Sequence, residues 1–351
     1  MLIFKRQFLT AEFYFLQTSL LPSGLKVASF DSEASAVSTV GVLVKAGSSY
    51  ESYDNLGVSH ALRMATGLSS KNATNFAIGS LRQHHILYSL LLDNIFPFHI
   101  EVRNVQQMGG SISVLAGREY IMYTLTSPRP YVGELFNYLN EAVSAPAFKP
   151  WELNDHVYAR MAEDIENLDA NSQAIELLHK AAYRSGLGQS LYSPEYMIGQ
   201  HKSNSLSDFH AKTHTVTRTV VAANGVDHRI VSKLGSQLNL EKGHGPTQPV
   251  KYFGGESRLD CGGQHAVVAL AVESGSASNA KDSLTFQLLR NILGTGPKIG
   301  RGNLSGKLGK AVGKIEGQKA VSGLNFSYQD SGLVGAFVMA EAAIAGNVSS
   351  G

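Results

Sequence analysis

The chain has 351 residues, of which 43% are hydrophobic and 17% are charged, so it can bury a sizeable core and is not a disordered protein. Its 30 basic and 28 acidic residues give a formal net charge of +2, which excludes a protein whose main role is to wrap nucleic acid. The single cysteine, Cys261, excludes an internal disulfide framework. At about 150 residues per domain, the length predicts two domains or one large one.

The sequence contains no convincing membrane span. The longest apolar stretch, Ile86 to Ile100, is interrupted by Asp93 and Pro97, whereas a span needs about 20 apolar residues. Residues 1–17 have no small-residue cleavage site after an apolar core, and we interpret them as an atypical N-terminal extension.

Residues 18–238 predict one α+β domain. Alternating residues from Leu25 to Phe30 indicate a strand, and a second strand from Val37 to Lys45 ends in a Gly-Ser turn. Apolar residues at helical spacing then predict a helix from Val58 to Leu68. The remaining predictions are a hairpin over 111–116 and 120–126, a strand over 217–223, and helices over 131–143, 151–168, 173–183, 205–213 and 227–238.

Residues 79–102 differ sharply from their flanks. They are rich in Leu, Ile, Phe and His and show no consistent period. A helix is predicted to begin on one side of them, from Ser70 to Ile78, and Asn104 to Met108 resembles its end on the other side.

Residues 239–257 are rich in Gly, Pro, Lys and Gln and predict an interdomain linker. After it, the pattern of the first domain starts again. Both Val40–Leu68 and Val267–Gly294 give a strand, a Gly-Ser turn, a polar loop and an amphipathic helix, and Val44 corresponds to Val272, 228 positions later. A hairpin follows in each case. The repeat predicts two homologous α+β halves.

The first candidate site lies near the start of the predicted helix at His60. The inverted zinc motif H-x-x-E-H needs Glu and His at its last two positions. Here Arg63 places a permanent cation where a divalent metal would lie, and Met64 is a poor zinc ligand. Because zinc sites use three or four protein ligands, one imidazole is not enough. We predict no metal site and no catalytic residue.

Two further stretches have simpler interpretations. The Gly-rich segment Leu293–Lys310 does not match the phosphate-binding motif G-x-x-x-x-G-K-[ST], because Arg301 stands at the position of the first glycine and Leu308 at that of the final Ser or Thr. The segment therefore predicts a basic flexible loop and no nucleotide cofactor. The acidic residues of the helix predicted over 151–168 indicate a solvated face; they are Asp155, Glu163, Asp164 and Glu166.

The residues before His60 resemble the zinc-site entrance of the pitrilysin-type metallopeptidases, a family that includes the mitochondrial processing peptidase. Gly47, Glu51 and Gly57 precede His60 at the spacing of that family's motif. The likeness covers about residues 20–345; other stretches that carry it are LPSGLKVAS, APAFKPWEL, AIELLHKAAYRSGLGQSLYSPEYMIG and NFSYQDSGLVGAF. It implies an α+β fold of two homologous halves, each a mixed sheet with helices packed on one face.

Carried over position by position, the family's first zinc histidine falls on His60, its catalytic glutamate on Arg63 and its second zinc histidine on Met64. The third ligand, a glutamate on a downstream helix, falls near Ala162 or, with a one-residue slip, on Glu163. The resemblance therefore implies that peptidase chemistry has been lost.

The likeness is strongest to a non-catalytic member of the family. It implies a structural subunit of a mitochondrial inner-membrane complex, on the matrix side, that pairs with a homologous core subunit and binds neither a cofactor nor nucleic acid. The alternative is a subunit of a processing peptidase, a zinc metalloendopeptidase that binds presequences. In that case the Gly-rich segment 293–310 would present precursors, although its lysines and Arg301 would repel basic presequences.

The sequence departs from the family's pattern in three places. Residues 79–102 look inserted, and an insertion there would split a helix and expose apolar side chains. Residues 1–17 lack the usual presequence character. The second half, residues 258–351, is truncated by comparison, because it lacks the helical region that follows the hairpin in the first half.

Overall fold

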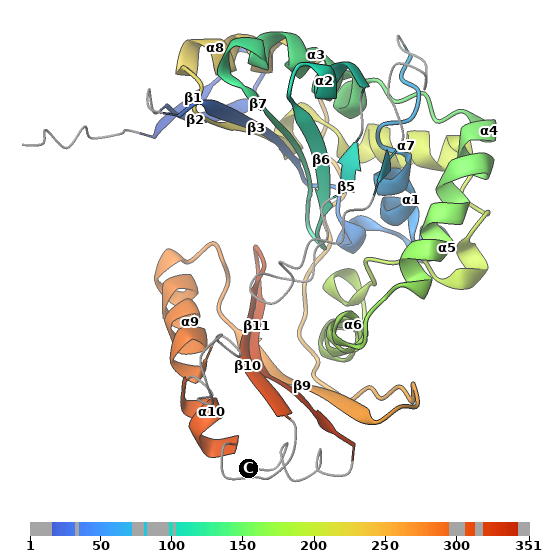
Figure 1. The fold of residues 1–351 in the computed structure, drawn as a ribbon, viewed down its shortest axis with the longest axis vertical. Helices are drawn as coiled ribbons and strands as arrows, with labels where there is room; N and C mark the ends of the chain where they lie inside the picture. The colour runs from blue at the N-terminus through green and yellow to red at the C-terminus, as the bar shows by residue number, and fades with distance from the viewer. Residues whose placement is uncertain are drawn as a thin grey trace, which may run out of the picture.

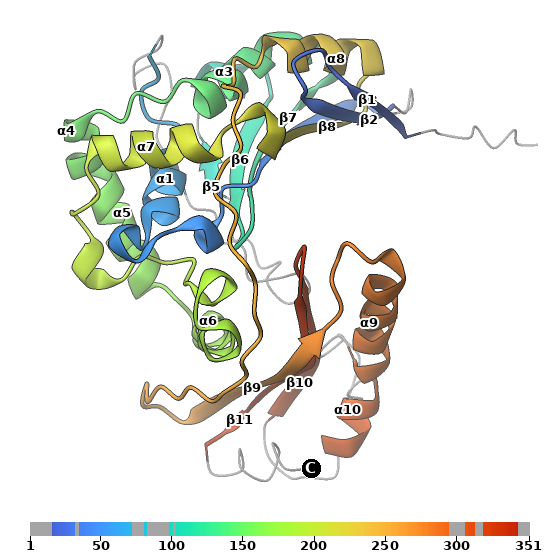
Figure 2. The ribbon, with the colours of Figure 1, turned by 180° about the vertical axis from the view of Figure 1, so that it is seen from behind.

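The fold consists of two α+β parts joined by an extended connection (Figures 1 and 2). It is seen in a computed structural model that describes residues 16–31, 35–71, 81–82, 98–100, 103–294, 306–312 and 319–342. Residues 239–264 form the connection and contain no helix or strand.

The first part is built on a mixed sheet with strand order β1-β2-β8-β3-β7-β6-β5-β4. β2 and β8 are parallel, and the other described pairs are antiparallel. The strands are β1 Gln17–Leu20, β2 Lys26–Phe30, β3 Val37–Val44, β4 Leu81–Arg82, β5 Phe98–Ile100, β6 Ser111–Ala116, β7 Ile121–Pro128 and β8 Thr219–Asn224.

One face of this sheet carries the helices, as predicted. In β7, Ile121, Tyr123 and Leu125 are buried, while the residues between them are half-buried. This alternation is typical of an antiparallel sheet covered on one side. Helix α3 (Val132–Ser144) packs on β7 and β3, and α8 (His228–Gln237) packs on β2 and β8 (Figure 1).

The other helices of the first part lie beside the sheet. They are α1 Val58–Ala65, α2 Arg103–Gln107, α4 Pro150–Glu152, α5 Tyr158–Glu166, α6 Ala170–Tyr183 and α7 Ser203–Thr213. The helix predicted over 151–168 is interrupted: residues Leu153–Val157 between α4 and α5 form a π-helical turn. Helix α1 packs against both α5 and α7, and these contacts bring the candidate zinc motif to α5.

The second part repeats the core of the first. Its sheet has the order β10-β11-β9, all antiparallel, which matches β6-β7-β3. The elements are β9 His265–Ser274, α9 Ala280–Leu293, α10 Gly306–Val312, β10 Lys319–Ser327 and β11 Gly332–Glu341. The prediction of two homologous halves is confirmed. The prediction of a loop over residues 293–310 is wrong for residues 306–310, because these residues belong to helix α10.

The region of the expected insertion is described only in part. Strands β4 and β5 lie within residues 79–102 and extend the first sheet beyond β6. The helix predicted from Ser70 to Ile78 lies outside the described residues, apart from Ser70 and Lys71, which are not helical. The insertion stays a prediction.

Helix α6 joins the two parts. It packs on β9, and its Tyr183 is buried in a cluster with Leu187 and Leu333 of β11. The Tyr183 hydroxyl also lies 3.1 Å from the Ser331 hydroxyl. This contact places the start of β11 beside the candidate site of the first half.

Candidate functional site

Helix α1 begins where two loops meet. Gly57 precedes it with φ +85°, and a Cβ at this position would come within 2.3 Å of the Ser193 hydroxyl, so a glycine is needed. The Glu51 carboxylate accepts hydrogen bonds from the N–H groups of Gly57 (2.7 Å) and Ser59 (2.8 Å). Glu51 therefore caps the N-terminus of α1, because its carboxylate accepts hydrogen bonds from N–H groups that have no partner within the helix.

Glu51 does this in a fully enclosed position. Its side chain is only 2% exposed. Burial raises the pKa of Glu51 to about 7, although the hydrogen bonds from Ser59 and Gly57 act in the opposite direction. The ionisation of Glu51 is therefore coupled to the fold near neutral pH.

His60 lies one turn into α1 with both ring nitrogens engaged. The Ser193 N–H donates to its Nδ1 (3.1 Å), so the ring proton is on Nε2, which donates to the Asp164 carboxylate (3.1 Å). Burial, the main cause, lowers the pKa of His60 to about 4 and keeps the ring neutral. The edge of the ring meets Tyr192, with ring centroids 5.7 Å apart.

Arg63 competes for the same carboxylate. One of its terminal nitrogens, Nη2, lies 2.7 Å from Oδ2 of Asp164, the oxygen that His60 also contacts. Both members of this ion pair are buried, with side chains 4% and 7% exposed. A carboxylate in such a place needs a compensating cation, and here the protein supplies one of its own.

Asp164 is the residue that the sequence analysis missed. We placed the third-ligand position near Ala162 or on Glu163, but Ala162 is half-buried without contact to His60 among the described interactions, and Glu163 points into solvent. Our interpretation of Asp164 as part of a solvated face is wrong, because α5 buries it against α1. A signal was present: Val157, Met161 and Asp164 recur at helical spacing, and the first two are core residues.

These residues do not fit a zinc ion. His60 has no lone pair to offer in the observed arrangement, and Arg63 already neutralises Asp164. Met64 is fully buried in the main core cluster. In the part of the chain that the structure describes, no three His, Cys, Asp or Glu side chains gather as a metal site would require.

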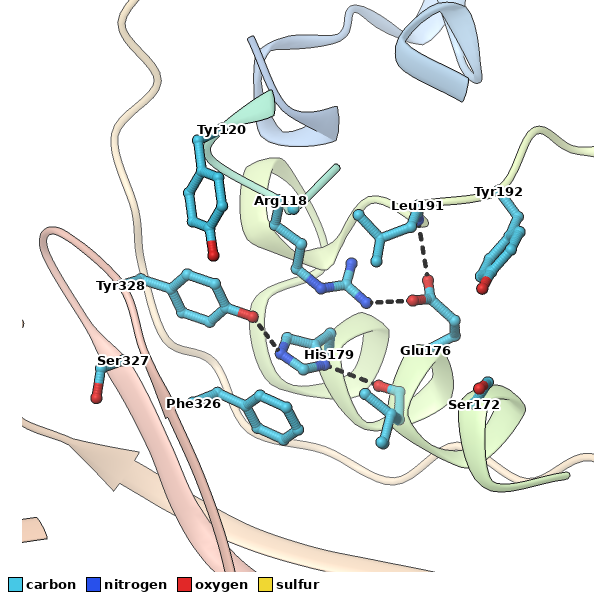
Figure 3. A pocket seen from close by; sticks show the side chains of 12 residues that line it. Arg118, Tyr120, Ser172, Glu176, His179, Leu191, Tyr192, Phe326, Ser327 and Tyr328 are labelled. Carbon is cyan, nitrogen blue, oxygen red and sulfur yellow. Dashed lines mark hydrogen bonds and ion pairs between the residues drawn. The ribbon is translucent and has the colours of Figure 1, made fainter. Parts of the chain in front are cut away.

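A cavity of about 80 Å³ lies next to this site, between the two halves (Figure 3). Tyr192 borders both the cavity and His60. The other walls come from the turn before β7, from α6, and from the end of β10; the labelled residues are Arg118, Tyr120, Ser172, Glu176, His179, Leu191, Tyr192, Phe326, Ser327 and Tyr328.

The ionisable side chains of this cavity bind each other. Arg118 lies 2.6 Å from one carboxylate oxygen of Glu176, and the other oxygen accepts the N–H of Leu191. His179 donates through Nδ1 to the Ile175 carbonyl (2.8 Å) and accepts the Tyr328 hydroxyl at Nε2 (2.7 Å), as Figure 3 shows. Burial lowers the pKa of His179 well below its usual value, so it is neutral. This arrangement joins the two halves.

The described helices contain no segment long and apolar enough to cross a membrane. The sequence profile of the insulinase family, peptidase family M16, matches residues 26–84 and 101–195. The gap between these two matches falls within the expected insertion.

Curated relatives match almost the whole chain. The "Cytochrome b-c1 complex subunit 2, mitochondrial" of Homo sapiens is 34% identical over 95% of this chain and 69% of its own length, and the Mus musculus protein has the same values. A "Probable mitochondrial-processing peptidase subunit alpha-1, mitochondrial" of Arabidopsis thaliana is 28% identical over 92% of this chain and 61% of its own length.

We expect the replacement Glu51→Gln to remove a pH dependence of stability. Between about pH 4.5 and 7 the unfolded chain ionises Glu51 while the folded chain retains the proton, so the wild type loses stability as the pH rises. The free energy of unfolding of the wild type, minus that of the variant, should fall by about 3 kcal/mol from pH 4 to pH 8. Urea denaturation at several pH values measures it. The stability of the variant at each pH reports the contribution of all other titrating groups. If the difference in unfolding free energy between wild type and variant did not change with pH, the role of Glu51 would be contradicted.

We also expect Arg63, rather than the missing second histidine alone, to prevent zinc binding. Met64→His should not bind zinc, because Arg63 still occupies the Asp164 carboxylate. Adding Arg63→Gln should free the Asp164 carboxylate, which with His60 and the introduced histidine should hold about one zinc per chain, since three ligands suffice for an open site. Metal analysis after dialysis measures this. One zinc bound by the Met64→His variant would contradict the expectation.

Proposed function

This chain belongs to the insulinase family, peptidase family M16, and from that membership we propose that it is a non-catalytic structural core subunit of the mitochondrial cytochrome b-c1 complex. Such a subunit contributes to assembly and stability and carries no redox cofactor. The observation that carries the proposal is the ion pair of Arg63 with Asp164 at the position of the family's metal. A peptidase of this type needs those groups free to hold zinc and to activate water.

The nature of the site supports a structural role. The three buried carboxylates around it have partners within the protein: Glu51 holds the start of α1, Asp164 holds His60 and Arg63, and Glu176 holds Arg118. Buried carboxylates that are paired and hydrogen-bonded in this way rigidify a structure.

The proposed location is the matrix side of the mitochondrial inner membrane. The names of the human and mouse relatives support a mitochondrial protein of the cytochrome b-c1 complex. The proposed partners are a homologous core subunit 1 and other subunits of that complex, and no nucleic acid. A peripheral attachment is consistent with the absence of a membrane-spanning helix among the described residues.

The alternative is a subunit of the mitochondrial processing peptidase. It is supported by the Arabidopsis thaliana relative, which is 28% identical, against 34% for the human cytochrome b-c1 subunit. As a non-catalytic partner in such a heterodimer, the chain would not need a zinc site of its own. The two proposals differ in the assembly that the chain joins.

We expect a tagged copy of the full chain, expressed in mitochondria, to migrate with the cytochrome b-c1 complex on a native gel. The result is expected because the relatives with the higher identity are subunits of that complex. Migration as a smaller heterodimer that cleaves a basic presequence peptide would instead support the processing peptidase. Chelator-sensitive cleavage by the purified chain alone would contradict both, because it requires a metal that the site does not fit.

A further inference from the structure

The cavity between the two halves contains a buried N–H donor without an acceptor. Arg118 lines this cavity, and its side chain is only 3% exposed. Its Nη1 donates to the carbonyls of Leu187 and Gln189, and its Nη2 donates to the carboxylate of Glu176. The Nε–H group has no acceptor among the described residues. Because buried donors are nearly always paired in proteins, this donor indicates a place for a bound molecule.

Two hydroxyl groups of the same cavity are also unpaired. Ser172 and Tyr192 both line the cavity, and neither hydroxyl has a hydrogen-bond partner among the described residues. In Figure 3 both hydroxyls lie on the side of the cavity where Glu176 is. The Ser172 oxygen is enclosed by its neighbours, whereas the Nε atom of Arg118 is not among the enclosed atoms and faces the cavity. Unpaired polar groups in such a position lower stability unless a bound molecule satisfies them.

The opposite side of the cavity is aromatic. The rings of Tyr120, Phe326 and Tyr328 lie there, as Figure 3 shows. The Tyr328 hydroxyl donates to His179, so this residue offers the cavity its ring. Apolar walls that enclose a few placed polar groups are typical of sites for small molecules.

Arg118 and Glu176 together present a donor next to an acceptor. Their ion pair is 2.6 Å long, and Figure 3 shows the guanidinium and the carboxylate side by side in the cavity wall. Each carboxylate oxygen has two lone pairs, so Glu176 retains acceptor capacity after binding Arg118 and the N–H of Leu191. A carboxamide is the complement of such a pair, because it carries a carbonyl oxygen next to N–H donors.

The volume of the cavity limits the size of the ligand. It measures about 80 Å³. An apolar cavity of about 150 Å³ binds benzene, which has six non-hydrogen atoms, so this cavity corresponds to a ligand with about three or four. The same volume corresponds to two or three water molecules at about 30 Å³ each.

The charges of the walls favour a neutral ligand. Glu176 already matches the charge of Arg118, so a carboxylate in the cavity would add an uncompensated negative charge beside Glu176. An ammonium group would lie beside the guanidinium of Arg118 and would meet the same penalty. A carboxamide makes both hydrogen bonds without a net charge.

We propose that this cavity binds a small neutral carboxamide. Its carbonyl oxygen accepts the Nε–H of Arg118, its N–H donates to the Glu176 carboxylate, and its carbon atoms contact the aromatic rings. Because Arg118 belongs to the first half and Phe326 to the second, a bound ligand contacts both halves and stabilises their association. The inference does not depend on the proposed function.

The test compares acetamide with acetate, two ligands of the same shape that differ in charge. The full chain carries labelled isoleucine and leucine methyl groups, and NMR follows the signals of Ile175 and Leu191, which line the cavity. We expect acetamide to shift both signals saturably with a dissociation constant of about 1–10 mM, since four non-hydrogen atoms provide little binding energy. Acetate should bind at least about tenfold more weakly.

Two variants that fill the cavity locate the site. Ser172→Val and Leu191→Phe should each abolish the saturable shift of the Ile175 signal by acetamide. The Ser172 hydroxyl has no hydrogen-bond partner among the described residues, so its removal should leave the fold intact. Ser207→Val is the matched control, because Ser207 of α7 is exposed and does not line the cavity.

Three outcomes would overturn the proposal. Acetate binding as tightly as acetamide would identify an anion site instead. The absence of a saturable shift up to about 50 mM acetamide would show that the cavity admits only water. Unchanged binding by both filling variants would place the binding site elsewhere.

Discussion

The ion pair between Arg63 and Asp164 is the constraint on which the site depends. Two helices, α1 and α5, meet there, and a carboxylate that is 7% exposed is neutralised by a guanidinium 2.7 Å away. Breaking a buried pair by removal of one partner costs about 3–5 kcal/mol, because the other charge is left uncompensated. The pair therefore fixes Asp164 beside His60 and holds the two helices together.

The same principle extends beyond this pair to the rest of the framework. Glu51 holds the start of α1, while Arg118 and Glu176 fix the turn before β7 against α6. From α6, His179 reaches Tyr328 of the second half. Each of these charged groups has a partner within the chain, so they stabilise the architecture.

Local patterns predicted most of the fold. The β-branched run of β3 and the helical spacing of α1 needed no long-range information. The repeat linking Val44 to Val272 predicted a second strand, helix and hairpin, which the structure shows as β9, α9, β10 and β11. The role of Asp164 was not predicted, because a charged residue on a helix is usually solvated. Only its spacing from Met161 indicated burial. The contact of His179 with Tyr328 joins residues 149 positions apart, and no sequence spacing indicates such a pair.

A double-mutant cycle on Arg63 and Asp164 tests the central claim most directly. The free energy of unfolding would be measured for the wild type, Arg63→Met, Asp164→Asn and the double variant. If Arg63 is the internal counter-cation of Asp164, each single variant should be strongly destabilised, and the double variant should recover at least about 2 kcal/mol of the summed loss. Additive effects, with a coupling energy near zero, would show that the two charges do not support each other and would contradict the account.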